Sequence, residues 1–145
     1  MKHSLFALLA LAGSLASTQL SAHHSFAAEF DAEQPINLRG IVTKVDWTNP
    51  HTYFYIDVET DAGDYEEWAL EMGSPNGLMR RGWTRNTLEI GSEVIVAGTR
   101  ARDGSFKGNA QTVTIADGCQ RLFAGTSQRD FAEDETATPV GECAP

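Results

Sequence analysis

The chain has 145 residues, with 20 acidic and 11 basic residues and a formal net charge of −9 at pH 7. Its apolar fraction of 41% and charged fraction of 21% are those of an ordinary globular protein, which argues against a disordered chain. The acidic balance, with no basic cluster longer than Arg80-Arg81, argues against nucleic acid and anionic lipid as partners.

The first 22 residues have the pattern of a secretory leader. A lysine near the start precedes a short apolar run, and small residues precede a cut after Ala22. The apolar run is too short to span a bilayer, and no cysteine at the cut offers a site for a lipid anchor. A second small-residue site would place the cut after Ala16. We expect the later cut, a periplasmic chain that begins at His23, and no membrane anchor.

The expected mature chain is one domain over residues 23–125, followed by an acidic C-terminal tail over residues 126–145. Its two cysteines, Cys119 and Cys143, predict a disulfide, because exported chains with an even cysteine count commonly pair them. Closing that loop would stabilise the chain by roughly 3 kcal/mol. Two free thiols are the alternative.

Alternation of apolar and polar residues predicts five strands, at residues 36–47, 52–59, 65–72, 93–101 and 106–115. In the first strand the apolar phase changes around Gly40, which predicts a bulge or sharp bend. After the third strand, Ser74 and Pro75 predict the cap and first position of a short helix. That helix is expected to extend through Arg81 and to end at Gly82.

This order of elements predicts an all-β domain. A long bent first strand, and one short helix between strands three and four, are typical of the small five-stranded barrel of the OB type. A small β-sandwich is the alternative.

Three histidines remain in the expected mature chain: His23, His24 and His51. An N-terminal histidine offers an amine and an imidazole at one point, a ready chelate for copper. We expect the segment before the first strand to reverse at Gln34-Pro35 and run back beside that strand. Both stretches span about 36–40 Å at ~3.3 Å per residue, which would bring His23 to the loop that holds His51.

His23 and His51 would then supply three nitrogens in a T shape, a set that suits Cu(II) and, with fewer ligands, Cu(I). His24 is a candidate to replace either imidazole. The arrangement resembles the histidine brace of copper chaperones and copper oxygenases. Zinc is the next candidate, although no further ligand motif supports it. Solvated histidines with no metal are the alternative reading.

Alternation places Tyr53, Tyr55 and Tyr65 on the outer face of the second and third strands, with four carboxylates on the same face. The carboxylates are Asp57, Glu59, Glu67 and Glu71. In an OB barrel this face binds ligands, and tyrosines there can stack on a sugar or contact a peptide. Simple cross-strand packing with solvated carboxylates is the alternative.

Four sequence blocks in order resemble a known family: HHSFAAEF, VTKVDWTNPHTYFYIDV, SPNGLMRRGW and VAGTRARDGS. They are similar to the uncharacterised bacterial exported family numbered 6152 among domains of unknown function. The resemblance runs from about residue 23 to 125. It implies a periplasmic location and a small β-barrel-like domain, and brings no established activity. The cysteine pair and the acidic tail depart from the family's usual pattern.

The sequence therefore favours an exported binding module over an enzyme. The leading hypothesis is a module that stores, delivers or senses copper through His23, His51 and His24. The second is an OB module that binds a periplasmic partner or a saccharide through its tyrosines, without a metal. The third is a copper-dependent oxidoreductase, which would need an open coordination position beside a substrate surface.

Overall fold

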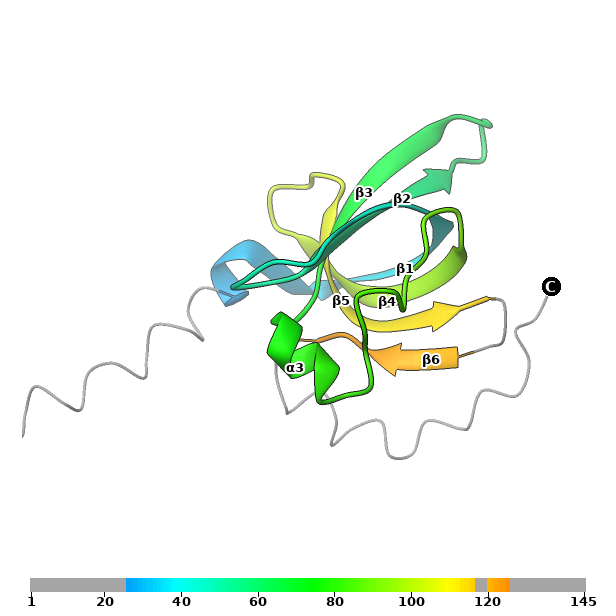
Figure 1. Cartoon of the computed structure of the whole chain (residues 1–145). Coiled ribbons are helices and arrows are strands. Elements are labelled where there is room, and N and C mark those ends of the chain that lie inside the picture. The colour runs from blue at the N-terminus through cyan, green and yellow to red at the C-terminus, as the bar shows by residue number, and fades with distance from the viewer. Residues whose placement is uncertain (1–25, 117–119, 126–145) are drawn as a thin grey trace, which may run out of the picture.

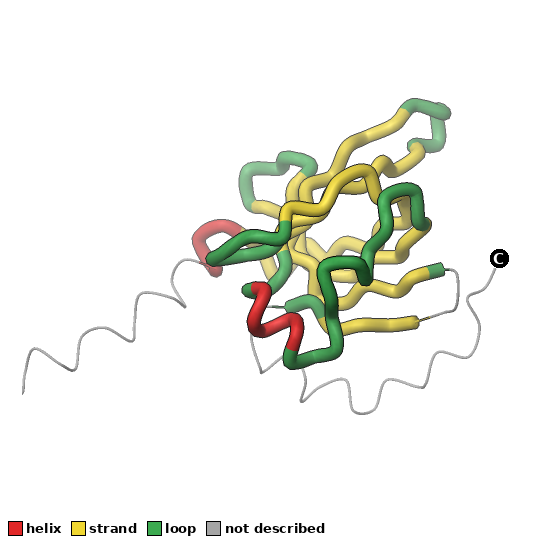
Figure 2. The backbone as a smooth tube through the Cα atoms, viewed as in Figure 1, coloured by secondary structure: helices red, strands yellow, loops and turns green. Residues whose placement is uncertain are grey.

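The computed structural model describes residues 26–116 and 120–125. Within these ranges the chain forms one sheet of six strands that curves into a ring, with short helical segments beside it (Figures 1 and 2). The strands are β1 Phe30–Asp46, β2 Tyr53–Glu59, β3 Tyr65–Glu71, β4 Glu93–Ala101, β5 Lys107–Ile115 and β6 Gln120–Phe123. Helix α3 is Pro75–Met79, and residues 26–29 form a single helical turn before β1. The all-β prediction is confirmed, and β6 is a strand that the sequence pattern did not predict.

Strand pairing explains the ring. The sheet order is β3-β2-β1-β4-β5-β6, and neighbouring strands pair antiparallel. In addition, β3 and β5 pair parallel from Ala69↔Lys107 to Glu71↔Asn109. This last pairing joins two strands that lie apart in the sheet order, so the sheet bends back on itself. It also brings the start of β5 beside the end of β3.

The reversal expected at Gln34-Pro35 is wrong. Pro35 lies within β1, which begins at Phe30 and pairs with β4 from Phe30↔Ala101 onward. A register shift between Asp31 and Pro35 interrupts the pairing at this point. An irregularity of this kind accommodates a proline, which has no N–H to donate to the ladder.

The change of apolar phase in β1 occurs later than expected. The register with β2 shifts between Val42 and Lys44, and Ile41 is 40% exposed on the outer face. Gly40 has a different role: a Cβ there would lie 2.6 Å from the carbonyl oxygen of Asp57 on β2. The glycine is therefore needed for close approach of two strands.

Helix α3 begins as predicted and ends sooner. The Ser74 side chain caps it by accepting a hydrogen bond from the Gly77 amide at 3.3 Å, and Pro75 occupies the first turn. The C-cap is Arg80, and the chain then turns at Gly82, whose φ is +90°. No helix in the described part of the chain is long and apolar enough to cross a membrane.

The core fills the inside of the ring. Its fully buried members come from five strands and the connection between β3 and β4; they include Val42, Phe54, Ile56, Leu70, Leu78, Trp83, Val94, Val96 and Val113. The Trp83 indole donates a hydrogen bond to the Phe123 carbonyl at 2.8 Å, which ties β6 to this connection. Trp68 is also buried, and Trp47 packs against the core from a partly buried position.

Candidate functional site

A network of polar side chains includes His51, which lies in the loop between β1 and β2. Nδ1 of His51 lies 2.7 Å from Oε1 of Glu71, within the range of a charge-assisted hydrogen bond. The Glu71 residue is 3% exposed, whereas the His51 side chain is 43% exposed. Within the described residues, Nε2 of His51 has no polar partner. One ring nitrogen is thus held by a buried carboxylate, and the other is available.

Tyr53 completes this network. Its hydroxyl donates a hydrogen bond to Oε2 of Glu71, so both carboxylate oxygens have partners. Burial of the hydroxyl, and then the bond to Glu71, raises the pKa of Tyr53 above its ordinary value. The phenol therefore stays a donor at neutral pH, and it holds the carboxylate beside the histidine.

Sheet register brings these three residues together. Tyr53 begins β2 and Glu71 ends β3, and the two are direct partners across the strands. His51 precedes Tyr53 by two residues, in the loop that leads into β2. The interpretation of solvated outer-face carboxylates is therefore wrong for Glu71, which is buried at the seam between β3 and β5.

Lys107, at the start of β5, connects this network to the beginning of the described chain. Its ammonium group forms an ion pair with Glu29, in the helical turn of residues 26–29. It also lies over two aromatic rings, 5.8 Å from the centroid of Phe30 and 5.6 Å from that of Tyr53. Figure 1 shows this helical turn, in blue, at the same end of the ring as the loop between β1 and β2.

Arg102, in the turn between β4 and β5, also anchors this N-terminal segment. Its backbone N–H donates to the Glu29 carbonyl at 2.9 Å, and its Nε donates to the Ala27 carbonyl at 2.8 Å. Its guanidinium lies 3.6 Å from the Asp31 carboxylate. Phe26 packs against Phe30 with ring centroids 5.2 Å apart. The segment of residues 26–31 is thus attached to the turn by backbone and side-chain contacts.

A cavity of about 380 Å³ lies between this segment and the turn that joins β4 to β5. Its lining residues are Ala28, Glu29, Ala101, Arg102, Asp103 and Lys107. The charged groups in the wall pair with one another or with neighbours, since Lys107 pairs with Glu29 and Asp103 accepts from Ser105 at 2.6 Å. The cavity is therefore a polar hollow whose charges are already balanced.

The three predicted tyrosines do not form one cluster. Tyr53 belongs to the network at one end of β2, whereas Tyr65 pairs with Glu59 at the other end and is 64% exposed. Six residue steps separate these positions, about 20 Å at ~3.3 Å per step. Lys44 covers Tyr55, with its ammonium 4.8 Å from the ring centroid.

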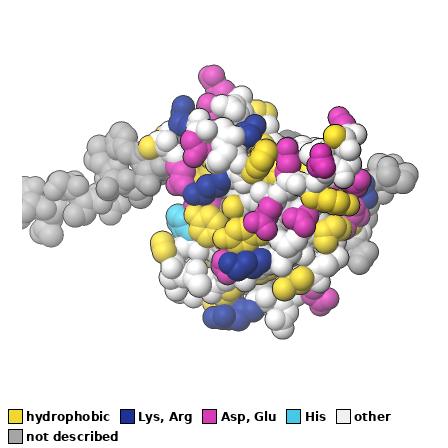
Figure 3. Space-filling view, turned by 90° about the horizontal axis from the view of Figure 1, so that it is seen from above, with side chains coloured by type: hydrophobic (Ala, Val, Ile, Leu, Met, Phe, Trp, Pro, Cys, Tyr) yellow, Lys and Arg dark blue, Asp and Glu magenta, His cyan; other side chains and the backbone are white. Residues whose placement is uncertain are grey.

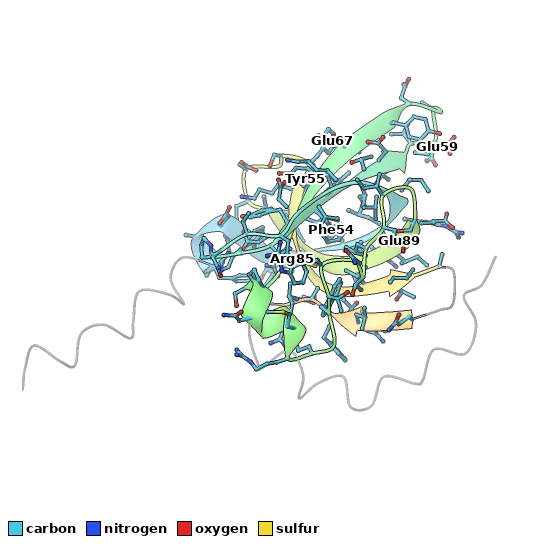
Figure 4. The ribbon with its side chains drawn as sticks, viewed as in Figure 1. Phe54, Tyr55, Glu59, Glu67, Arg85 and Glu89 are labelled. Atoms are coloured by element: carbon cyan, nitrogen blue, oxygen red, sulfur yellow. The ribbon has the colours of Figure 1, made fainter. Side chains whose placement is uncertain are left out.

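Figure 4 shows Glu59 toward the tip of the β2–β3 hairpin and Tyr55 nearer its base. Acidic side chains lie scattered among hydrophobic ones over the face seen in Figure 3, with fewer basic side chains between them. The outer face of β2 and β3 thus offers separate aromatic positions in an acidic surround.

Of the predicted metal ligands, the structure describes His51; His23 and His24 lie outside the described residues, as do Cys119 and Cys143. Within the described ranges, no three His, Cys, Asp or Glu side chains come together as a metal-binding group. The roles of Glu71 and Lys107 did not follow from the sequence pattern. The sequence shows only that each lies at one end of a strand, Glu71 at the end of β3 and Lys107 at the start of β5. Strand pairing then places both at the edge of the ring.

Comparison with known proteins identifies a family. No curated protein matches the chain. Residues 11–111 match the profile of a family described as "Family of unknown function (DUF6152)", which is more than half of the chain. The chain therefore belongs to this family, as the four sequence blocks indicated.

Proposed function

We propose that this protein is a small exported binding module that holds one copper ion through an N-terminal histidine brace, in order to store, deliver or sense it. The observation that carries the proposal is the contact between His51 and Glu71. A ligating histidine usually gives its second ring nitrogen to a carboxylate, which fixes the tautomer and aims the free nitrogen at the metal. Glu71 is buried and lies 2.7 Å from Nδ1, a contact that in the neutral ring favours the proton on Nδ1 and the lone pair on Nε2.

The remaining ligands in this proposal are the amine and imidazole of His23, with His24 as a substitute. His23 stands three residues before Phe26, where the described chain begins. Three residues reach at most about 10 Å. The segment that follows is attached near Tyr53 through Glu29 and Lys107, which favours a meeting with His51. Amine and imidazole nitrogens together suit Cu(II).

We further propose that the ring is a barrel of the OB type. In its support, β1 pairs with both β2 and β4, β3 pairs parallel with β5, and α3 lies between β3 and β4 in the chain. In this assignment β6 is an addition to the five strands of the barrel. The expected leader supports a periplasmic location.

The first experiment is native mass spectrometry of the protein purified from a periplasmic fraction with equimolar Cu(II). We expect a chain that begins at His23 and retains one copper ion against competing glycine. A chain that begins at Ser17, or one that loses copper freely, would refute the brace.

Two variants then test the ligands. His51→Ala should weaken Cu(II) binding at least tenfold, because it removes one of three nitrogens. The double variant His23→Ala with His24→Ala should lose as much, since it removes the N-terminal imidazole and its substitute. Thr48→Ala, in the same loop as His51, is the matched control and should bind like the parent. An unchanged affinity in both ligand variants would rule out the brace.

The second candidate function is binding of a periplasmic protein or a saccharide on the outer face of β2 and β3. The observation that favours it is Tyr65, a large ring that is 64% exposed. Tyr65→Ala and Tyr55→Ala should abolish such binding and leave copper affinity unchanged. Loss of copper binding in these variants would argue against two separate surfaces.

A further inference from the structure

We propose that Lys107 is a positioning residue that couples the docking of the N-terminal segment, residues 26–31, to the geometry of the His51 ring. Its consequence for copper rests on the proposed function, because the brace needs both the N-terminus and His51. The coupling itself concerns described residues alone and can be measured without any metal.

The ammonium group of Lys107 contacts both the segment of residues 26–31 and the Tyr53 ring. On one side, Lys107 pairs with the Glu29 carboxylate and lies 5.8 Å from the Phe30 ring centroid. On the other side, it lies 5.6 Å from the Tyr53 ring centroid. Its side chain is 31% exposed, so both contacts are partly shielded from water. A cation over an aromatic face is attracted by the ring quadrupole, and shielding strengthens that attraction.

Tyr53 is linked to His51 through the carboxylate of Glu71. The Tyr53 hydroxyl and Nδ1 of His51 hold the two oxygens of one carboxylate, that of Glu71. Because Glu71 is only 3% exposed, water cannot readily replace either partner if one moves. A shift of the Tyr53 ring therefore changes the position of Glu71 and with it the orientation of the His51 ring.

Arg102 and Lys107 both hold the segment of residues 26–31, but only Lys107 links it to Tyr53 among these two residues. Arg102 attaches the same segment through the Ala27 and Glu29 carbonyls, and no contact links its side chain to Tyr53. Lys107 contacts the segment and Tyr53 together. Loss of the Arg102 side chain should loosen the segment, whereas loss of the Lys107 charge should loosen the segment and also disturb His51.

Thermodynamic linkage gives the functional consequence. If docking of residues 26–31 favours copper binding, then copper binding must favour docking by the same factor. Copper held between the N-terminus and His51 should therefore protect this segment from hydrogen exchange. The affinity of the protein for copper should fall when Lys107 no longer contacts both the segment and Tyr53.

The test compares Lys107→Met with Lys44→Met in the full mature chain. The two lysines have the same kinds of contact: Lys44 pairs with Asp46 at 2.6 Å and lies 4.8 Å from the Tyr55 ring centroid. No contact links Lys44 to residues 26–31, so it controls for loss of a lysine charge over a tyrosine. Lys107→Arg keeps the cation and should restore the parent behaviour.

Three readouts are expected to move together in Lys107→Met. Cu(II) affinity, measured by competition with a chromogenic chelator, should fall about fivefold or more, in the lower range of measured couplings. Hydrogen exchange across residues 26–31 of the metal-free protein should become faster. The ring NMR signals of His51 in the metal-free protein should shift, and Lys44→Met should leave all three unchanged.

The outcomes separate the two proposals. Copper binding by the parent, with the three readouts unchanged in Lys107→Met, would overturn the coupling and leave the brace intact. A parent that holds no copper would end the proposed function, and the exchange and NMR readouts would still decide the coupling. If Lys107→Met does not fold, Glu29→Gln breaks the same ion pair from the other side, and the same expectations apply to it.

Discussion

Replacement of Glu71 by glutamine is the sharpest test of the site. The carboxylate accepts from the Tyr53 hydroxyl with one oxygen and lies 2.7 Å from Nδ1 of His51 with the other. Glutamine has nearly the same shape but places an NH₂ donor where one oxygen stood. Both neighbours act as donors toward the carboxylate, so one of them must reorganise. The simplest change moves the His51 proton from Nδ1 to Nε2, which removes the lone pair intended for the metal.

The magnitude follows from burial and charge. Hydrogen bonds to a charged group contribute about 1.5–3 kcal/mol, and those between neutral groups about 0.5–1.5 kcal/mol. Because Glu71 is 3% exposed, we expect Glu71→Gln to lower the free energy of unfolding by about 1–2 kcal/mol. Copper affinity should fall roughly 10–100-fold, as is typical for loss of a carboxylate that supports a ligating histidine.

The assay combines Cu(II) competition with ¹⁵N NMR of the His51 ring, which reports the tautomer directly. Glu67→Gln is the matched control, because Glu67 is an exposed carboxylate on the same strand. We expect wild-type affinity in the control. An unchanged tautomer together with an unchanged copper affinity in Glu71→Gln would refute the reasoning that the buried carboxylate orients His51.

Three further changes have definite expected outcomes. Tyr53→Phe leaves a buried oxygen of its carboxylate partner without a donor and should cost about 1–2 kcal/mol in chemical denaturation. The folded state raises the pKa of Tyr53, so the contribution of its hydroxyl to stability is complete below about pH 10 and is lost as the pH rises further. Tyr53→Phe should therefore lose less stability above pH 10 than the parent. Gly98→Ala should lower the free energy of unfolding by about 1–3 kcal/mol, because the new Cβ would lie 2.0 Å from a backbone oxygen of β5. Gly77→Ala is the control: its Cβ meets nothing nearer than 3.2 Å, so the same measurement should change by less than about 1 kcal/mol. A disulfide between Cys119 and Cys143 should lower the intact mass by about two units relative to the reduced chain, and equal masses would refute it.

The sequence was sufficient for features that depend on near neighbours in the chain. Alternation with a period of two residues predicted both ends of β4, at Glu93 and Ala101. Capping preferences predicted the start of α3 from Ser74 and Pro75. In each case the deciding interactions lie within a few residues, so local patterns carry the information.

Long-range pairing decided the rest. β1 extends back to Phe30 because β4 offers it a partner there, and a register shift accommodates Pro35. No local pattern predicts either the partner or the shift. The proposed route of the N-terminus to His51, by reversal and retreat along the first strand, failed for this reason.

The candidate site likewise belongs to the tertiary structure. The sequence alone named His51 as a ligand candidate and placed Glu71 on the same outer face as Tyr53. It had no means to show that Glu71 is buried, since that burial arises where β3 pairs with β5, at residues 38 positions apart in the chain. Parallel pairing across that distance is specified by the packing of the whole ring, and this pairing converts an ordinary strand-end glutamate into the buried carboxylate that holds the histidine.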